Sequence, residues 1–339
     1  MIPIAFKKNL SHKAASSTVL AGDVGGTKTN MALYQVNRDS LTILKEKRYV
    51  SRDYHSLTDI IRDFCGESLP ERICAAVAGP VLHGKSKLTN LAWQLDSEVM
   101  SEALGASVDF INDLEATAYG LAGLQPDELA TLATGDPSAE GNIAVIAPGT
   151  GLGEGGLFWD GDQYHPFASE GGHSDFAPRD RIDMELFLYL QKQFGHVSWE
   201  RVVSGMGIKS IYQFLTEAKK EKVPEWLAQR MQKEDPAAVI SEAALEREDP
   251  VCSEAMALFV RYLATEAASL VLKLKATGGL YIGGGIPPKI LPLLQHESWI
   301  KNFGNCGRMR PLLEQVPVYV ILNDKMALLG AACYGAYNM

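Results

Sequence analysis

The sequence predicts an α/β protein that is built from two similar lobes, and two observations lead to this expectation. The chain has 339 residues, which exceeds the ~250 to 300 residues that a single hydrophobic core usually supports. Strands that end in glycine-rich turns occur in both halves of the chain, near residues 25, 149 and 283. Turns of this kind, spread over both halves, indicate two lobes that each contribute a turn to one ligand.

The composition is that of an ordinary water-soluble globular protein, with 46% hydrophobic and 22% charged residues. The net charge of -9 argues against a broad nucleic-acid or anionic-membrane surface. No apolar run reaches 18 residues, so we expect no membrane-spanning helix. The cysteines are scattered and lack metal-ligand spacing, which favours a reduced cytoplasmic protein without structural zinc. These cysteines are Cys65, Cys74, Cys252, Cys306 and Cys333.

Residues 1–17 are basic and rich in serine, but they lack the apolar region of a secretory signal. We expect a flexible N-terminal extension there, with an organellar targeting segment as the alternative.

The first glycine turn joins a strand expected over 18–24 to a second strand over 30–36. Glycines let backbone amides approach an anion because no Cβ stands in the way. Asp23 ends the first strand, and an acid beside a phosphate site makes sense when a cation such as Mg²⁺ lies between them. A plain hairpin with Asp23 as a cap is the alternative. The amides that we expect at the anion are those of Gly25, Gly26 and Thr27.

Two further turns follow the same pattern. Residues 151–156 match G-x-G-x-x-G, but an aromatic strand and a turn follow instead of the helix that a dinucleotide requires. After the third turn, Pro287 and Pro288 suit the first turn of a helix that we expect to continue through 294. The turns consist of Gly149, Thr150 and Gly151, and of Gly283, Gly284 and Gly285.

Residues 79–86, "GPVLHGKS", match the P-loop pattern G-x-x-x-x-G-K-[ST]. A P-loop must lie between a strand and a helix whose N-terminus faces the phosphates. A strand is expected over 73–78, but the nearest helix start is Asp96, an N-cap for a helix that ends at Gly105. The context therefore argues against a P-loop.

Together these segments make the chain resemble the bacterial-type glucokinases, within the hexokinase and actin-like ATPase superfamily. The stretches "GDVGGT", "APGTGLG" and "GGLYIGGGI" resemble the two phosphate motifs and the adenosine-side motif of that family. Five more stretches match in the same order: "TNLAW", "INDLEATAYG", "EGGHSDFAP", "GHVSWERVVSGMG" and "NDKMALLGAA". The resemblance runs from about residue 20 to 337, without the Cys-rich zinc signature of the neighbouring ROK family.

The resemblance implies a two-lobed actin-like ATPase (ribonuclease H-like) fold with an interdomain active-site cleft, whose closure would exclude water. It implies a small α/β domain of residues 18–123 plus 323–339 and a large α/β domain of residues 124–322. Helical patterns also indicate helices over 184–195 and over 253–277, the second capped by Gly278. In the family, the C-terminal helix returns to pack on the first lobe.

Phosphoryl transfer to a sugar hydroxyl requires a base that accepts the hydroxyl proton. Asp113 lies between an expected strand and an expected helix, and it is the candidate base, with Asn112 as a neutral hydroxyl partner. The alternative, that Asp113 caps this helix, is compatible with that role.

Sugar recognition requires several fixed polar groups, because each buried group that is left unpaired penalises the wrong epimer. Glu170 and His173 are separated by two glycines, which lets them converge on one small ligand. By resemblance, Glu170, His173 and Glu200 hold the sugar hydroxyls, joined by Asn90.

These features favour a cytoplasmic, ATP- and Mg²⁺-dependent glucokinase that phosphorylates glucose in the first step of glycolysis. We expect no nucleic-acid or membrane partner, and a homodimer is left open. A kinase for another hexose or another phosphoryl donor is one alternative. A non-catalytic actin-like protein is a second, which the combination of Asp113 with the Glu170, His173 and Glu200 set disfavours.

Overall fold

The structure is a computed structural model, and it describes residues 2–6, 17–37, 40–66, 68–88, 91–218, 220 and 222–338. The chain divides into two compact units, which are described separately here. The first unit comprises Met1–Pro126, Leu157–Ala168 and Lys325–Met339, and the second comprises Asp127–Gly156 and Ser169–Asp324. The domain bounds expected from the sequence stay a prediction.

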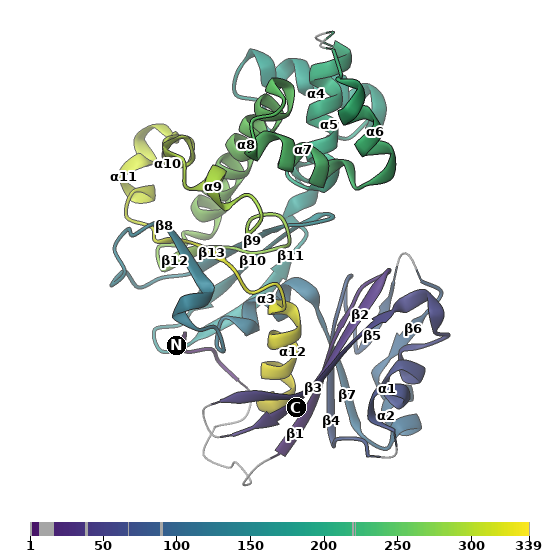
Figure 1. Cartoon of the computed structure of the whole chain (residues 1–339). Helices are drawn as coiled ribbons and strands as arrows, with labels where there is room; N and C mark the ends of the chain where they lie inside the picture. Colours follow the sequence, from purple (N-terminus) through teal and green to yellow (C-terminus); the bar gives the residue numbers. More distant parts are fainter. Residues whose placement is uncertain are drawn as a thin grey trace. The chain divides into compact units, whose positions relative to one another are not determined.

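A five-stranded mixed sheet with the order β3-β2-β1-β4-β7 forms the centre of the first unit (Figure 1). Strand β1 pairs antiparallel with β2 and parallel with β4, so the predicted hairpin around the first glycine turn is confirmed. The continuous run of buried residues along β1, from Val19 to Gly22, shows that this strand is covered on both faces of the sheet. The strands are β1 (Ser17–Val24), β2 (Lys28–Val36), β3 (Leu41–Val50), β4 (Arg72–Val77) and β7 (Ser107–Asn112).

Helices cover both faces of this sheet. Helices α1 (Leu57–Cys65) and α2 (Ser97–Leu104) share one hydrophobic cluster with strand residues such as Leu20 and Phe110. On the other face, α12 (Met326–Tyr337) packs against β1, β4 and α3 (Asp113–Gly120), as the family resemblance implies (Figure 1). The approach of α12 to α3 is very close, because a Cβ on Gly330 would lie 1.6 Å from the carbonyl oxygen of Ala116. Only glycine fits there.

The beginning of the chain, expected to belong to a flexible extension, is anchored to the first unit. The N–H of Ala5 donates to the carbonyl oxygen of Tyr164 at 2.8 Å, within strand β11. The ring of Phe6 lies 4.9 Å from that of Tyr337 between centroids. Residues 7–16 of the expected extension lie outside the described residues.

The P-loop-like residues 79–86 lead into a small hairpin. Strand β5 (Lys85–Lys87) pairs antiparallel with β6 (Gln94–Asp96), and Nζ of Lys85 lies 2.8 Å from a carboxylate oxygen of Asp96. Asp96 caps α2 by accepting from the N–H groups of the first turn, and Gly105 ends α2 with φ 65°. The prediction that this motif match is not a P-loop is confirmed, since the motif runs into strand β5 and the next helix, α2, begins only at Ser97.

A six-stranded sheet with the order β11-β10-β9-β12-β13-β8 forms the centre of the second unit, although residues 157–168, in β10 and β11, are counted with the first. Strand β12 pairs in parallel with both β9 and β13, and β8 adds an antiparallel edge. Five of these strands repeat the order of the first sheet, a hairpin followed by parallel strands. The strands are β8 (Leu129–Ala133), β9 (Ile143–Pro148), β10 (Leu152–Trp159), β11 (Tyr164–Ser169), β12 (Gly279–Ile282) and β13 (Val318–Ile321).

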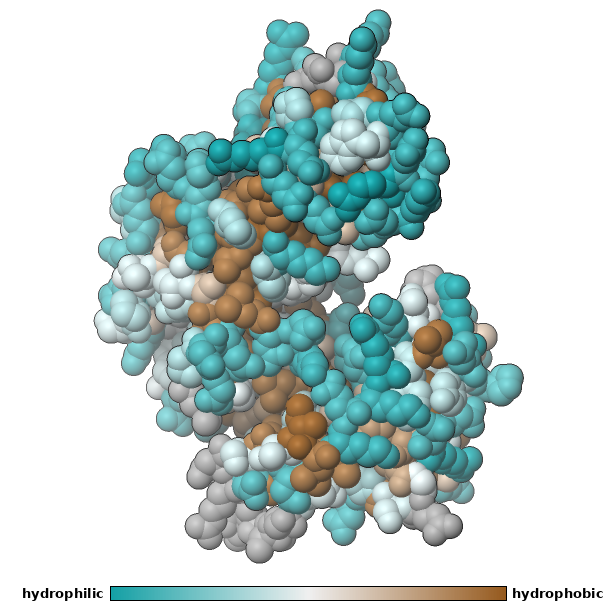
Figure 2. All heavy atoms as spheres, viewed as in Figure 1, coloured by the Kyte–Doolittle hydropathy of each residue, from teal (hydrophilic) through white to brown (hydrophobic). Residues whose placement is uncertain are grey.

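Helix α8 (Pro250–Leu274) is the central helix of the second unit. Among the described residues it is the one helix that is long and apolar enough to cross a membrane, but 78% of its apolar window is buried. Figure 2 shows the outer helices of this unit as mainly hydrophilic, as expected when α8 forms the core. The predicted cap Gly278 is wrong: α8 ends at Lys275 with φ 50°, because the N–H of Gly278 pairs with the carbonyl oxygen of Asn142 at 3.0 Å.

The helix expected from Pro287 begins only at Leu291. Two N–H groups, those of Lys289 and Ile290, bond to the carbonyl oxygen of Ile286, which holds the intervening residues in a turn. The helix that follows is four residues long, so the predicted helix start is wrong. The other helices of this unit are α4 (Arg181–Phe194), α5 (Gly205–Gln213), α6 (Glu225–Lys233), α7 (Pro236–Leu245), α9 (Leu291–Leu294), α10 (Glu297–Phe303) and α11 (Arg310–Leu313).

Candidate active site

The first glycine turn is held from behind by Ser51. The hydroxyl of Ser51 donates to the carbonyl oxygen of Gly25 at 2.9 Å, and its N–H donates to that of Thr27 at 3.0 Å. The N–H of Gly25 itself closes the turn on the carbonyl oxygen of Lys28 at 3.0 Å. Thr27 is exposed while Gly25 and Gly26 are half-buried. Fixed backbone dipoles at an exposed turn suit the binding of an anion.

Asp23 lies two residues before Gly25, the first glycine of the turn, and it pairs with Asn30 on β2. The side-chain amide of Asn30 donates to Oδ2 of Asp23 at 3.1 Å. Burial raises the pKa of Asp23, and the Asn30 hydrogen bond and the charge of Arg48 act in the opposite direction. A carboxylate that burial penalises gains from a nearby cation, and Mg²⁺ needs only one or two carboxylates when phosphates and waters complete its shell. The donor set therefore fits Mg²⁺ bound with a phosphate ligand.

Asn112, not Asp113, caps α3. Oδ1 of Asn112 accepts from the N–H groups of Leu114 at 2.9 Å and Glu115 at 3.2 Å. The Nδ2 amide donates to the carbonyl oxygen of Gly79 at 3.2 Å. The alternative in which Asp113 is the N-cap is therefore wrong, because Asn112 is the last extended residue of β7. Asn112 keeps one amide hydrogen for a ligand.

Asp113 is the first residue of α3, directly after the carboxyl end of β7. Its Oδ1 accepts from the N–H of Leu114 at 2.9 Å. This places a half-buried carboxylate at the helix N-terminus, where the helix dipole favours negative charge. Asn90, the other sugar contact expected in this part of the chain, lies outside the described residues.

In the second unit, the two predicted sugar-binding segments lie side by side. The N–H of Trp199 donates to the carbonyl oxygen of Ser174, and that of Phe176 donates to the carbonyl oxygen of Val197, both at 3.0 Å. The rings of Phe176 and Trp199 meet edge to face with 5.0 Å between centroids. This pairing brings the segment of Glu170 and His173 next to the segment of Glu200.

Glu170 and His173 flank the two glycines at the ends of one tight turn, and both are exposed. The N–H of His173 donates to the carbonyl oxygen of Glu170 at 3.0 Å. A Cβ on Gly172 would lie 2.1 Å from the carbonyl oxygen of Leu152. The turn therefore rests directly on strand β10, and only glycine permits this approach.

Glu200 links the sugar segment to the second glycine turn. Its Oε2 accepts from the N–H of Leu152 at 3.0 Å. A Cβ on Gly151 would lie 2.4 Å from the same oxygen. A carboxylate predicted to hold a sugar thus touches a turn that is predicted to hold phosphate.

The second and third glycine turns lie together at the carboxyl ends of β9 and β12. Gly284 has φ 83°, and a Cβ on it would lie 2.3 Å from the carbonyl oxygen of Pro148. The N–H of Gly283 donates to the carbonyl oxygen of Ile146, and that of Gly205 donates to Gly149. Ligands of α/β sheets bind outside the carboxyl ends of parallel strands, where Gly149, Thr150, Gly151, Gly283, Gly284 and Gly285 gather.

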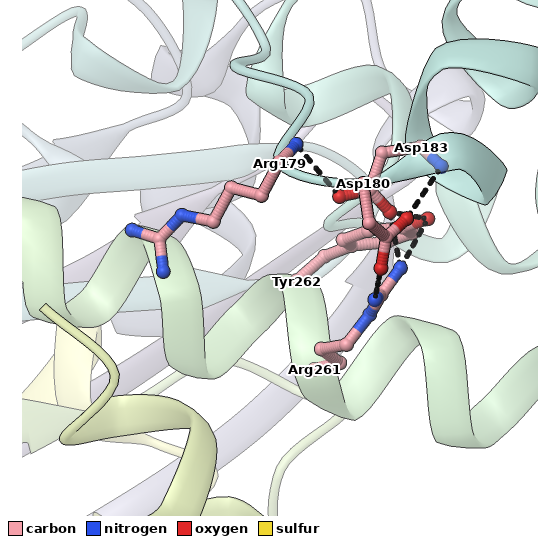
Figure 3. A network of polar contacts seen from close by, with 5 residues as sticks. All are labelled: Arg179, Asp180, Asp183, Arg261 and Tyr262. Atoms are coloured by element: carbon pink, nitrogen blue, oxygen red, sulfur yellow. Dashed lines mark hydrogen bonds and ion pairs between the residues drawn. The ribbon is translucent and has the colours of Figure 1, made fainter.

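A separate polar network fixes the chain that follows the sugar segment (Figure 3). The guanidinium of Arg261 on α8 pairs with the carboxylates of Asp180 and Asp183, and the hydroxyl of Tyr262 donates to Asp183 at 2.8 Å. The N–H of Arg179 donates to Asp183 at 2.9 Å. The network borders a cavity of about 130 Å³. The guanidinium of Arg179 points away from the aspartates and donates to the carbonyl oxygen of Asn305, so Arg261 alone provides the cation. The network links the N-terminus of α4, which Asp180 caps, to α8, and this favours a structural role.

Sequence reasoning missed two residues that shape the site, Ser51 and Glu154. Ser51 gives no sequence signal, because it acts from a short turn after β3. Glu154 gave one, since it is an acid within the otherwise apolar strand β10, and its side chain is 1% exposed. An acid inside an apolar strand indicates a special role, because fully buried acids are rare unless they are paired.

The duplicated sheets and their glycine turns define a sugar kinase of the hexokinase and actin-like ATPase superfamily. The glucokinase family model matches residues 20–338, so the chain belongs to the glucokinase family. It is 44% identical over 336 residues to the glucokinase of Nostoc punctiforme, covering 94% of this chain and 98% of that one.

Solved structures agree with this assignment. The crystal structure of glucokinase from an Antarctic psychrotroph is 31% identical, with a TM-score of 0.81 and coverage of 94% of this chain and 98% of that one. A ROK family glucokinase from Streptomyces griseus, solved with glucose and AMPPNP, is 20% identical with a TM-score of 0.62, covering 93% and 98%. At that identity the second likeness shows the fold alone.

Proposed function

We propose that the chain transfers the γ-phosphoryl group of ATP to the 6-hydroxyl of glucose, which forms glucose 6-phosphate and ADP in the first step of glycolysis. One observation carries this proposal beyond family membership. Glu200 belongs to the segment paired with Glu170 and His173, and its carboxylate touches the turn at Gly151. A kinase needs such a junction, because the acceptor hydroxyl must lie beside the transferred phosphate.

In the proposed mechanism, Glu170, His173, Glu200 and Asn90 hold the sugar hydroxyls, with the remaining amide hydrogen of Asn112. The carboxylate of Asp113 accepts the proton of the 6-hydroxyl as its oxygen bonds to the γ-phosphorus, while the bond to ADP breaks. Transfer therefore releases one proton, which Asp113 passes to solvent.

The backbone amides of the three glycine turns would hold ATP. Asp23 would hold Mg²⁺, largely through water, and the ion supplies charge neutralisation at the phosphates. Ser51 would keep the first turn rigid, so that its amides need no reorganisation on binding.

The proposed small domain, residues 18–123 plus 323–339, would carry the base and the cation site. The proposed large domain, residues 124–322, would carry the three other sugar-binding side chains. We place the enzyme in the cytoplasm, in keeping with its five free thiols. Its partners would be glucose and ATP, with no nucleic acid or membrane and with a homodimer left open.

A coupled assay of ADP release tests the proposal. Glucose, mannose, fructose and N-acetylglucosamine are compared as acceptors, with ATP and polyphosphate as donors. The highest kcat/KM is expected for glucose with ATP. A larger value for another sugar or for polyphosphate would favour a kinase of the same class with a different substrate.

A further inference from the structure

Glu154 lies between α8 and the turn that carries Glu170 and His173. A Cβ on Gly171 would lie 2.3 Å from Oε2 of Glu154, so the carboxyl group packs against the backbone of this turn. The same strand residue also binds the turn through Ser169. The hydroxyl of Ser169 donates to the carbonyl oxygen of Glu154 at 2.8 Å and accepts from the N–H of Gly171 at 3.1 Å. Any displacement of Glu154 therefore moves the turn.

Glu154 faces a second buried acid. Glu266 of α8 is 0% exposed, and its Oε1 accepts from Nζ of Lys273 at 2.9 Å. Within the described part of the chain, Oε1 of Glu154 and Oε2 of Glu266 meet no hydrogen-bonding partner. Of the two acids, Glu266 is the one that Lys273 hydrogen-bonds, so a proton on Glu154 lowers the cost of burying two carboxyl groups near each other.

The proton belongs on Glu154, because Lys273 stabilises the ionised form of Glu266. Burial, followed by the charge of Glu266, raises the pKa of Glu154 to about 8, and Lys273 acts against this rise. Burial also raises the pKa of Glu266, which the Lys273 hydrogen bond and the charge of Arg179 oppose. The turn adds its own charged residues, Glu170 and His173, at its exposed ends.

We propose that Glu154 is a positioning residue whose protonated carboxyl group supports the turn of Glu170 and His173, so that loss of this proton weakens glucose binding. Once ionised, Glu154 repels Glu266 strongly, because both carboxylates are buried where water does not screen their charges. Since α8 is buried and the ends of the turn are exposed, we expect the turn to move rather than α8. The inference rests on the proposed role of this turn in binding glucose.

The test measures KM for glucose and kcat from about pH 6.5 to about pH 9.5. Above the midpoint of Glu154, wild-type KM should rise in proportion to the ionised fraction, approaching about tenfold per pH unit. The value of kcat should change less, because saturating glucose restores the bound form of the turn. Glu154→Gln is isosteric with the protonated acid, and its KM should stay within about twofold over the same range, as its amide does not titrate.

Two further variants sharpen the result. Glu266→Gln removes the charge that ionised Glu154 repels, so the rise in KM with pH should largely disappear. Glu185→Gln on α4 neutralises an exposed acid that pairs with Arg181, and its profile should match that of wild type. If Glu154→Gln shows the same rise in KM as wild type, the proposal is overturned.

A measurement of Tm without glucose separates this inference from the proposed function. A carboxyl group with a raised pKa binds its proton more tightly in the folded protein, so stability falls as pH rises from the ordinary value of 4.5 towards about 8. The difference in Tm between Glu154→Gln and wild type should therefore increase in favour of the variant as pH rises from 4.5 towards about 8. A constant difference would overturn the inference. If the difference in Tm changes with pH as expected but the protein does not phosphorylate glucose at any pH, the proposed function is overturned, and the positioning role with it.

Discussion

The two sheets share one strand order but end their strands with different chemistry. In the first unit, β1 leads to Asp23 and β7 leads to Asn112 and Asp113. In the second unit, β9 and β12 lead to glycine turns. Ala147 lies two residues before Gly149, the position that Asp23 has relative to Gly25 in the first unit. In the proposed mechanism, the first unit would supply carboxylates for a cation and a proton. The second would supply backbone amides and close packing.

The residues five positions after each turn's first glycine extend this comparison. In the first unit this residue is Asn30, which donates to Asp23. In the second it is Glu154, whose carboxyl group is buried beside a second acid. The same frame position thus holds a satisfied polar pair in one copy and an acid that needs a proton in the other. The two sheets thus share a strand order but differ in the polar groups that they carry at this position.

The largest effect should come from Asp113→Asn, which removes the proposed base of the first unit. We expect kcat to fall by about 10²- to 10⁴-fold. Glucose affinity, measured by fluorescence titration, should survive because an amide still accepts a hydrogen bond. The Tm should change little, because Asn112 provides the cap of α3. Asp109→Asn on β7 is the control, and turnover of Asp113→Asn within about tenfold of wild type would exclude Asp113 as the base.

Asp23→Asn tests whether the acid beside the first turn serves a cation. The apparent affinity for Mg²⁺, from the dependence of rate on its concentration at fixed ATP, should fall by about 10- to 100-fold. Because the Asn30 contact can persist with an amide, the Tm should not fall in parallel. If the Mg²⁺ dependence is unchanged, Asp23 does not serve a cation, and the proposed difference between the first glycine turn and the second is lost.

Glu170→Gln tests the ligand-holding role of the second unit. The amide keeps the shape but loses the charge of the acceptor, so glucose affinity should fall by about fivefold. The KM for ATP should stay the same, because Glu170 lies at the sugar turn. Equal losses for both substrates would instead indicate that Glu170 shapes the fold.

The smallest effect should come from Lys85→Ala, in the motif that resembles a P-loop. Its exposed ion pair with Asp96 contributes little to stability. We expect kcat within about threefold of wild type, since a lysine on the transferring phosphate would cost far more. A loss of about a hundredfold in a folded variant would return the phosphate site to this hairpin.

The strands that flank the glycine turns follow from the sequence, because strand, turn and strand are local patterns, whereas the strand orders of the two sheets do not. The end of α8 does not, since Lys275 rather than Gly278 takes the left-handed conformation, and the N–H of Gly278 donates to the carbonyl oxygen of Asn142, just before β9. The alternative in which Asp113 caps α3 is wrong for a similar reason, because the end of β7 decides that Asn112 is the residue before the helix. Contacts between distant segments, such as Glu200 with Leu152 or Glu154 with Gly171, depend on tertiary packing that no local pattern encodes.

The place of α12 has a consequence for synthesis on the ribosome. The sheet of the first unit is complete once β7 has emerged, but the face that α12 covers stays open until α12 has been made, after the whole second unit. Its glycine contact at Gly330 admits no substitute from elsewhere in the chain. The nascent first unit therefore exposes apolar surface while the second unit is translated, and its packing is completed only when α12 follows.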